Sequence, residues 1–154
     1  MSNEYELPLR LFMAFRGLID ELHAELARQG HPDARPLHGF VFQAIGPDGT
    51  TASELGRRLG ISKQGAAKTI NALEKLGYVR RGTDEHDARR KLVLLTDRGV
   101  DFLARSVRIF EQLHRKWAKT LGAQRLQAFE ADLRTMTRQT EFRLDVPGWF
   151  GGAG

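Results

Sequence analysis

The spacing of apolar residues predicts long amphipathic helices near both ends of the chain. Residues 5–28 carry apolar side chains every three or four positions, which places them on one helical face: Leu11, Phe15, Leu18, Leu22 and Leu26. A second stripe comprises Val100, Leu103, Val107, Phe110, Trp117 and Leu121, with His114 filling the one gap. A third comprises Leu126, Phe129, Leu133, Met136 and Thr140. This spacing is typical of packed helices, so we expect the stripes to need a partner surface.

Three shorter helices are predicted between these long ones. The first starts near Asp33, has Pro36 in its first turn and runs to Ile45. The second begins at Thr51 with the capping box T-x-x-E and ends at Gly60. Ser62 then caps a third helix, from Lys63 to Leu76.

Two short strands follow, over Tyr78 to Gly82 and Lys91 to Leu95. The loop between them is almost wholly charged and long for a hairpin, so it is interpreted as a wing. Thr96 is expected to cap the next long helix. The pattern predicts a mainly α fold with a small β-wing. Residues 47–96 form a winged helix-turn-helix, residues 1–46 and 97–145 a helical region, and residues 146–154 a glycine-rich tail.

The helix from Lys63 to Leu76 has two different faces when its residues are placed 100° apart. Its apolar side carries Ala66, Thr69, Ile70, Leu73, Leu76 and Gly77. Its opposite side carries amides and amines, namely Gln64, Lys68, Asn71 and Lys75. Such a face suits the major groove of DNA, where amides read adenine and lysine reaches guanine or phosphate. The alternative is an ordinary solvated helix face.

Charge distribution favours the DNA interpretation. Residues 51–98 hold 11 Lys and Arg against 6 Asp and Glu, a net charge of +5. The formal net charge of the whole protein is also +5, so the rest of the chain is neutral. A basic excess concentrated in one unit favours a polyanionic partner.

Several other classes of function find no support in the sequence. The chain has no cysteine, so thiolate metal sites and thiol-based sensing are excluded. Its apolar runs are short and its N-terminus lacks a secretory pattern, so we expect a cytoplasmic protein with no membrane partner. No enzyme motif, cofactor motif or metal-ligand cluster is recognisable. His23, His31 and His38 are expected to have structural or surface roles rather than to bind metal.

The segment from Asp87 to Gly99 reads D-A-R-R-K-L-V-L-L-T-D-R-G. It resembles the D-x-R…L-T-x-x-G signature of the MarR family of bacterial transcription regulators. The run L-E-K-L-G-Y-V-R-R from Leu73 to Arg81 and the order of the helices are also similar to that family. Arg90 and Lys91 depart from it, since the family more often has a small and an apolar residue there. This departure makes the wing more basic.

The resemblance implies a homodimer in which the N- and C-terminal helices interlock and two winged lobes bind double-stranded DNA. It further implies that Arg89 enters the minor groove, with Asp87 as its ion-pair or loop-shaping partner. A small aromatic or anionic effector is also implied, with Phe15, His38 and Phe42 as candidate lining residues. The complete set of expected DNA-contacting residues is Arg57, Ser62, Lys63, Gln64, Lys68, Asn71, Asp87, Arg89, Arg90 and Lys91.

The sequence therefore predicts a sequence-specific DNA-binding regulator, a repressor, that reads a pseudo-palindromic operator and is released by an effector. The alternative is a low-specificity or architectural DNA-binding protein that relies on Arg89, Arg90, Lys91 and backbone contacts. An enzyme is not expected.

Overall fold

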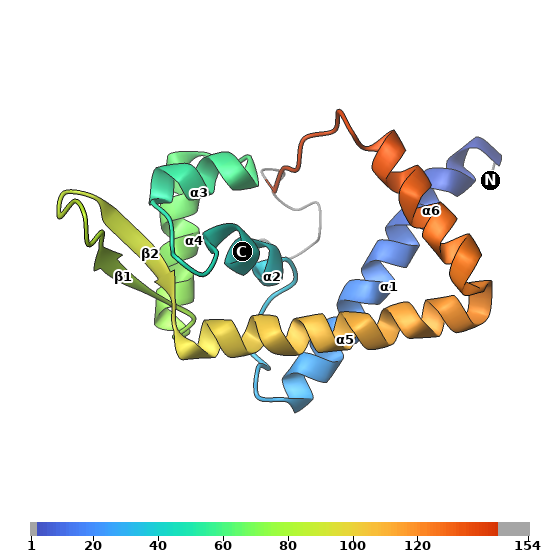
Figure 1. Ribbon diagram of the computed structural model, residues 1–154, viewed down its shortest axis with the longest axis horizontal. Coiled ribbons are helices and arrows are strands. Elements are labelled where there is room, and N and C mark those ends of the chain that lie inside the picture. The colour runs from blue at the N-terminus through green and yellow to red at the C-terminus, as the bar shows by residue number, and fades with distance from the viewer. Residues whose placement is uncertain (1–2, 145–154) are drawn as a thin grey trace.

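The chain folds into a winged-helix lobe joined to three long helices, as the computed structural model shows (Figure 1). The structure describes residues 3–144. A short 3-10 turn, η1 (Asn3–Tyr5), precedes the helices, which are α1 (Glu6–Arg28), α2 (His38–Ile45), α3 (Ala52–Leu59), α4 (Lys63–Lys75), α5 (Asp97–Leu121) and α6 (Ala123–Met136). Two antiparallel strands, β1 (Val79–Thr83) and β2 (Lys91–Leu95), form the wing. The predicted mainly α fold with a small β-wing is confirmed.

Side-chain caps begin three of the helices, as predicted. In each case a hydroxyl oxygen accepts a hydrogen bond from a backbone N–H three residues later: Thr51 from Glu54 at 3.1 Å, Ser62 from Gly65 at 2.9 Å, and Thr96 from Gly99 at 3.2 Å. These bonds satisfy amide groups that have no partner within the first turn of a helix.

The start of α2 was predicted wrongly, since the helix begins at His38 and not near Asp33. Arg35 precedes Pro36, and a residue before proline is disfavoured in the helical conformation. Leu37 then adopts a left-handed backbone with φ +76°. The reciprocal half of the capping box was wrong too, because the Glu54 carboxylate pairs with arginines of its own helix rather than with the cap.

The two strands pair from Val79 opposite Leu95 to Thr83 opposite Lys91. β2 has the predicted bounds, whereas β1 starts one residue later than predicted. Tyr78 was predicted as the first residue of that strand, but it lies just before the strand. Its side chain is fully buried in the core.

The centre of the core is a group of three aromatic rings from different parts of the chain. Phe42 lies 5.1 Å from Tyr78 and 5.0 Å from Phe102 between ring centroids, and the last two lie 5.7 Å apart. All three are fully buried. They join α2, the start of the wing and α5, so the winged lobe is packed directly on the long helices.

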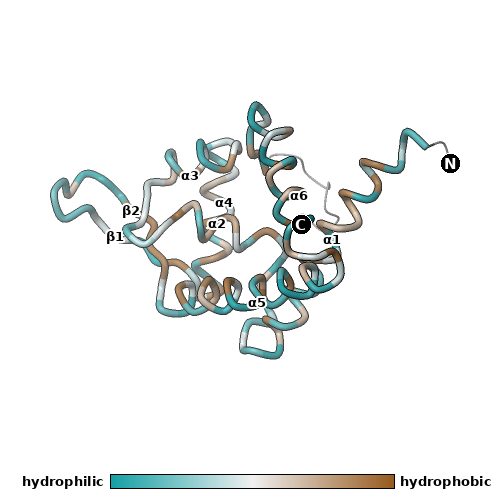
Figure 2. Tube along the Cα trace, turned by 45° about the vertical axis from the view of Figure 1, so that its right-hand side comes forward, coloured by the Kyte–Doolittle hydropathy of each residue, from teal (hydrophilic) through white to brown (hydrophobic). Residues whose placement is uncertain are grey.

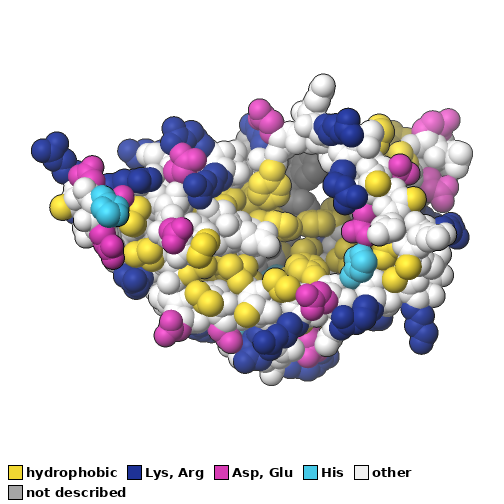
Figure 3. All heavy atoms as spheres, viewed as in Figure 1, with side chains coloured by type: hydrophobic (Ala, Val, Ile, Leu, Met, Phe, Trp, Pro, Cys, Tyr) yellow, Lys and Arg dark blue, Asp and Glu magenta, His cyan; other side chains and the backbone are white. Residues whose placement is uncertain are grey.

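Helix α5 has two apolar faces. Phe102, Ile109 and Leu113 are buried within the chain, whereas Val107 and Phe110 remain 51 % and 39 % exposed. The sequence pattern identified the exposed face. Figure 3 shows hydrophobic side chains gathered in a hollow above α5, between the winged lobe and α6. In the alternative view of Figure 2, apolar positions also continue along the N-terminal half of α1, which projects away from the lobe.

The last helix ends earlier than predicted, at Met136, so Thr140 lies outside it. The chain then crosses back to the winged lobe (Figure 1). There the Leu144 N–H donates to the Leu59 carbonyl at 2.9 Å, and the Phe142 ring lies 5.4 Å from Phe40. The predicted glycine-rich tail, residues 146–154, lies outside the described residues.

Candidate nucleic-acid interface

The outer face of α4 is the polar surface that the helical wheel predicts. Ala66, Ile70 and Leu73 are fully buried and fix the rotation of the helix. The opposite side chains are therefore directed outward, and all of them are exposed: Gln64, Lys68, Asn71 and Lys75. Because this face contributes nothing to the core, it is available to a partner.

The turn between α3 and α4 is tight because of two glycines. Gly60 ends α3 with a left-handed backbone of φ +64°. A Cβ on Gly56 would lie 3.1 Å from the Ile61 carbonyl oxygen, so glycine lets the turn approach the helix closely. This turn sets α4 across α3, in the arrangement of a helix-turn-helix (Figure 1).

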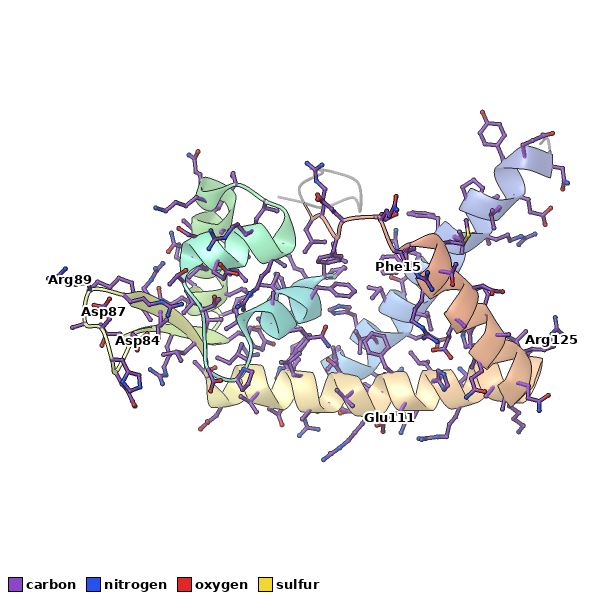
Figure 4. All side chains as sticks on the ribbon, turned by 45° about the horizontal axis from the view of Figure 1, so that its top comes forward. Phe15, Asp84, Asp87, Arg89, Glu111 and Arg125 are labelled. Atoms are coloured by element: carbon purple, nitrogen blue, oxygen red, sulfur yellow. The ribbon has the colours of Figure 1, made fainter. Side chains whose placement is uncertain are left out.

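Two aspartates shape the tip of the wing. Asp84 accepts a hydrogen bond from the His86 N–H at 2.9 Å, and Asp87 accepts one from the Arg89 N–H at 3.0 Å. Of the two roles predicted for Asp87, the structure bears out loop shaping. Figure 4 shows Arg89 at the outermost point of the wing, beyond both carboxylates. Among the hydrogen bonds and ion pairs of residues 3–144, none involves the Arg89 guanidinium.

The other basic residues predicted to contact DNA differ in whether they already pair with an acidic side chain of the same chain. Lys63 and Lys91 are exposed. Arg57 donates to the Glu54 carboxylate, a bond that holds the pKa of this carboxyl below its usual value. Arg90 Nη1 lies 3.3 Å from Asp84 Oδ2 in an ion pair. The last two arginines would therefore have to leave intramolecular partners in order to contact a phosphate.

Arg81, a residue of β1 that reaches the outer face of α4, was not among the residues predicted from the sequence. Its Nη2 donates to Asn71 Oδ1, and its Nε donates to Glu74 Oε1 at 3.4 Å. A wheel of one helix cannot show a side chain that arrives from a strand. The alternation of the strand could have indicated it, since Arg80 and Arg81 must point to opposite faces.

A small apolar pocket lies between α1, α2 and α5. Its walls include Ile19, His23, Phe40, Leu103, Val107 and Phe110. Burial lowers the pKa of His23. Burial also lowers the pKa of the neighbouring His38 to about 4, with a further contribution from the charge of His23. Phe42 was a wrong candidate for pocket lining, because the aromatic core buries it completely.

Residues 3–144 contain neither a metal-ligand cluster nor a membrane-spanning helix. No group of three or more His, Cys, Asp or Glu side chains there is arranged to hold a metal ion. No helix in this part of the chain is both long and apolar enough to cross a membrane. His31 is buried, with its ring nitrogens bonded to Tyr78 and Asp101, so the structural role predicted for it is confirmed.

Known proteins resemble this chain in two ways: a family model matches the sequence of the winged lobe, and solved structures match the fold of most of the chain. Residues 40–90 match the model of the MarR family. FabT of Streptococcus pneumoniae, solved in complex with DNA, is 18 % identical over 88 % of this chain and 96 % of its own, with a TM-score of 0.75. The transcriptional repressor CouR, bound to a 23-mer DNA duplex, is 23 % identical over 88 % of this chain and 94 % of its own, with a TM-score of 0.68. At these identities the two structures establish the fold.

One curated relative belongs to a different class of protein. A riboflavin kinase of Thermoplasma volcanium is 42 % identical over 53 residues, which are 34 % of this chain. The chain spans only 23 % of the length of that kinase.

Proposed function

We propose that this chain is a member of the MarR family, whose model its residues 40–90 match, and that it is a homodimeric, sequence-specific DNA-binding regulator of transcription, acting as a repressor. The observation that carries the proposal is that one lobe combines the exposed polar face of α4 with a projecting wing whose tip carries Arg89, a residue without an ion pair in the described part of the chain. Helix and wing together present donors to two adjacent surfaces of one duplex. FabT and CouR, which share the fold, were both solved with DNA.

In this proposal α4 enters the major groove. Gln64 lies in its first turn, where base contacts concentrate in helix-turn-helix proteins. Lys63, the Ser62 cap and Lys75 lie at the ends of the helix, close to the phosphates that border the groove. Arg89 enters the neighbouring minor groove, where the negative potential is strongest if the groove is narrow. Arg57, Arg90 and Lys91 supply further phosphate contacts.

Exposed apolar side chains support a second copy of the chain as the partner of the long helices. Large apolar residues remain exposed on three helices of the single chain, among them Leu7, Phe12 and Met13 on α1, Val107 and Phe110 on α5, and Phe129 and Met136 on α6. Exposed apolar side chains that gather in this way, as in the hollow above α5 (Figure 3), mark an interaction site. A two-fold dimer would present two α4 helices about one helical turn apart, so the operator would be a pseudo-palindrome with half-sites roughly 10 bp apart.

The pocket between α1, α2 and α5 is the proposed effector site. Its position at the base of the lobe would let a ligand alter the angle between α2 and the long helices. Because burial lowers the pKa of both His23 and His38, these side chains are neutral near pH 7 and offer no cation to an anionic ligand. We therefore favour an uncharged aromatic effector.

A non-enzymatic role is part of the proposal. The match to riboflavin kinase covers less than a quarter of that protein, so its activity does not carry over to this chain. The runner-up function is low-specificity DNA binding, which the extra basic residues Arg90 and Lys91 would favour.

Selection of bound duplexes from a random library, at two salt concentrations, tests the proposal. A specific regulator should enrich a palindromic motif and prefer it to random DNA by about 10³-fold or more. Affinity should fall steeply with salt, because each phosphate contact releases counterions. Salt-sensitive binding without a motif would favour the architectural function, and binding that does not respond to salt would overturn both.

A further inference from the structure

Arg81 and Asn71 form a hydrogen-bonded pair on the surface that we propose to read DNA. Asn71 lies in the middle of the exposed face of α4, between Lys68 and Lys75. Arg81 comes from β1, and its Nη2 donates to the amide oxygen of Asn71. Two elements thus contribute to one point of the recognition surface.

Glu74 is a second partner of the same guanidinium. This residue lies one turn after Asn71 on α4, and its carboxylate accepts from Arg81 Nε at 3.4 Å. The Arg81 side chain is nevertheless 50 % exposed. A guanidinium carries five N–H groups, and these contacts use two of them. Within residues 3–144 Nη1 makes no hydrogen bond, so its N–H groups remain available.

The pairing changes what Asn71 can offer to a base. A free asparagine amide presents one acceptor and one donor, which together match N6–H and N7 of adenine. In the pair, the Asn71 oxygen is directed toward Arg81, and the amide NH₂ is the group left for a ligand. The Asn71–Arg81 pair therefore presents hydrogen-bond donors.

We propose that Arg81 is a specificity-determining residue and that the Asn71–Arg81 pair reads guanine rather than adenine. This inference rests on the proposed function and names the base that one part of its surface selects. Guanine is the one base with two acceptors, N7 and O6, in the major groove. Adenine and thymine each offer a single acceptor there, and cytosine offers a donor. A pair that has only donors matches guanine best.

Arg80 provides a matched control for the loss of charge. It is the neighbouring residue of β1, it is also exposed, and strand alternation directs it to the other face of the wing. Arg80→Ala removes the same charge without touching Asn71. Arg81→Lys keeps the charge at position 81 but cannot form the planar two-sided contact.

The experiment is the same library selection, performed in parallel with the wild-type full-length chain and the variants N71A, R81A, R81K and R80A. N71A identifies the base position that depends on Asn71, because only there should the preference change. At this position the wild type should prefer guanine over adenine by roughly ten- to a hundredfold. In R81A the preference should shift toward adenine, in R81K it should weaken, and in R80A it should persist.

Three results would overturn the inference while leaving the proposed function intact. They are a wild-type preference for adenine at this position, an unchanged motif in R81A, and the same change of motif in R80A as in R81A. Failure of the wild type to enrich any motif would instead count against the proposed function itself. Thermal melts of each variant would show that a changed motif does not arise from unfolding.

Discussion

The Tyr78 hydroxyl lies 2.9 Å from Nδ1 of His31, across 47 residues of sequence. Tyr78 precedes the first strand of the wing, and His31 follows α1. The same hydroxyl donates its hydrogen to Asp33 at 2.9 Å, so its oxygen is the group that accepts from His31. Arg98 of α5 completes the cluster with a 2.9 Å ion pair to Asp33. This polar cluster, buried at His31 and Tyr78 and partly exposed at Asp33 and Arg98, connects the proposed DNA-binding lobe to the long helices.

Tyr78→Phe should destabilise the protein by about 1–3 kcal/mol, because it leaves the buried Nδ1 of His31 without its partner. Urea denaturation measures the change in free energy of unfolding. Tyr5→Phe is the control, since Tyr5 is 67 % exposed and its loss should change stability by less than about 0.5 kcal/mol. Equal effects of the two substitutions would show that the cluster contributes no stability.

The glycine that ends the D-x-R…L-T-x-x-G segment should not tolerate a side chain. A Cβ on Gly99 would lie 2.5 Å from the Tyr78 carbonyl oxygen, a distance that forces α5 and the wing apart. Gly99→Ala should therefore cost roughly 1–3 kcal/mol, as overpacked cores do. Gly17→Ala, on α1 with nothing within 4 Å, should stabilise by up to about 1 kcal/mol through helix propensity. Thermal unfolding of both variants would test whether Gly99→Ala lowers the melting temperature and Gly17→Ala raises it.

Local chemistry explains which features could be predicted from the sequence. The hydroxyl caps at Thr51, Ser62 and Thr96 depend on residues three positions away, so the sequence contains all the information that they need. The polar face of α4 likewise follows from the periodicity of one helix. The polar cluster around Tyr78 and the Asn71–Arg81 pair join residues from different elements. Strand alternation separates Arg81 from Arg80, but the periodicity of one element does not show which residue of another element it meets.

Helix α5 illustrates a different limit of periodicity. The helix has one apolar face toward its own core and another that is exposed, and both faces follow a spacing of three and four. The regular stripe through Val107 and Phe110 stood out in the sequence. The buried face, with Phe102 and Ile109, did not, because Ser106 interrupts it. Ser106 is compatible with burial since its hydroxyl donates to the Phe102 carbonyl at 2.8 Å.

Protonation of His38 should destabilise the fold in mildly acidic solution. Its pKa is lowered to about 4 in the folded state, chiefly by burial and secondarily by the nearby His23. The unfolded chain thus binds the proton first, so stability is complete above about pH 6.5 and declines as the pH falls toward 4. The loss would approach about 3 kcal/mol at the lower end.

The pH dependence of urea denaturation in wild type and His38→Gln would measure this effect. The variant should show a shallower decline between pH 6.5 and 4.5, with the remainder due in part to His23, whose pKa burial also lowers. Asp33 and Asp101 have pKa values below their ordinary ones, so their contributions are lost only at still lower pH. Identical slopes in the two proteins would contradict the assignment to His38.

Phe12→Asp should weaken the proposed dimer. Phe12 is 45 % exposed on α1, and in a two-fold assembly each substitution would act twice. Phe12 is already about half buried in the single chain, so its loss removes about 0.7–1.5 kcal/mol per protomer, and two such losses predict a rise in the dimer dissociation constant of at least about tenfold. Sedimentation velocity would measure it. Ala24→Asp adds the same charge to an exposed position of the same helix, and it should leave the dimer intact.

Arg89→Ala should weaken binding to the selected operator by roughly 1–3 kcal/mol and leave the dimer unchanged. The wing keeps its shape in this variant, because Asp87 bonds to the backbone N–H of residue 89 and not to its side chain. Loss of a phosphate or minor-groove contact should also reduce the slope of affinity against salt by about one. Fluorescence anisotropy over a salt series gives both quantities. Arg125→Ala removes the same charge at the opposite end of the molecule (Figure 4), so it separates a local contact from a general effect of net charge. If both variants lose affinity equally, Arg89 acts only through the charge of the whole protein, and the wing does not enter a groove.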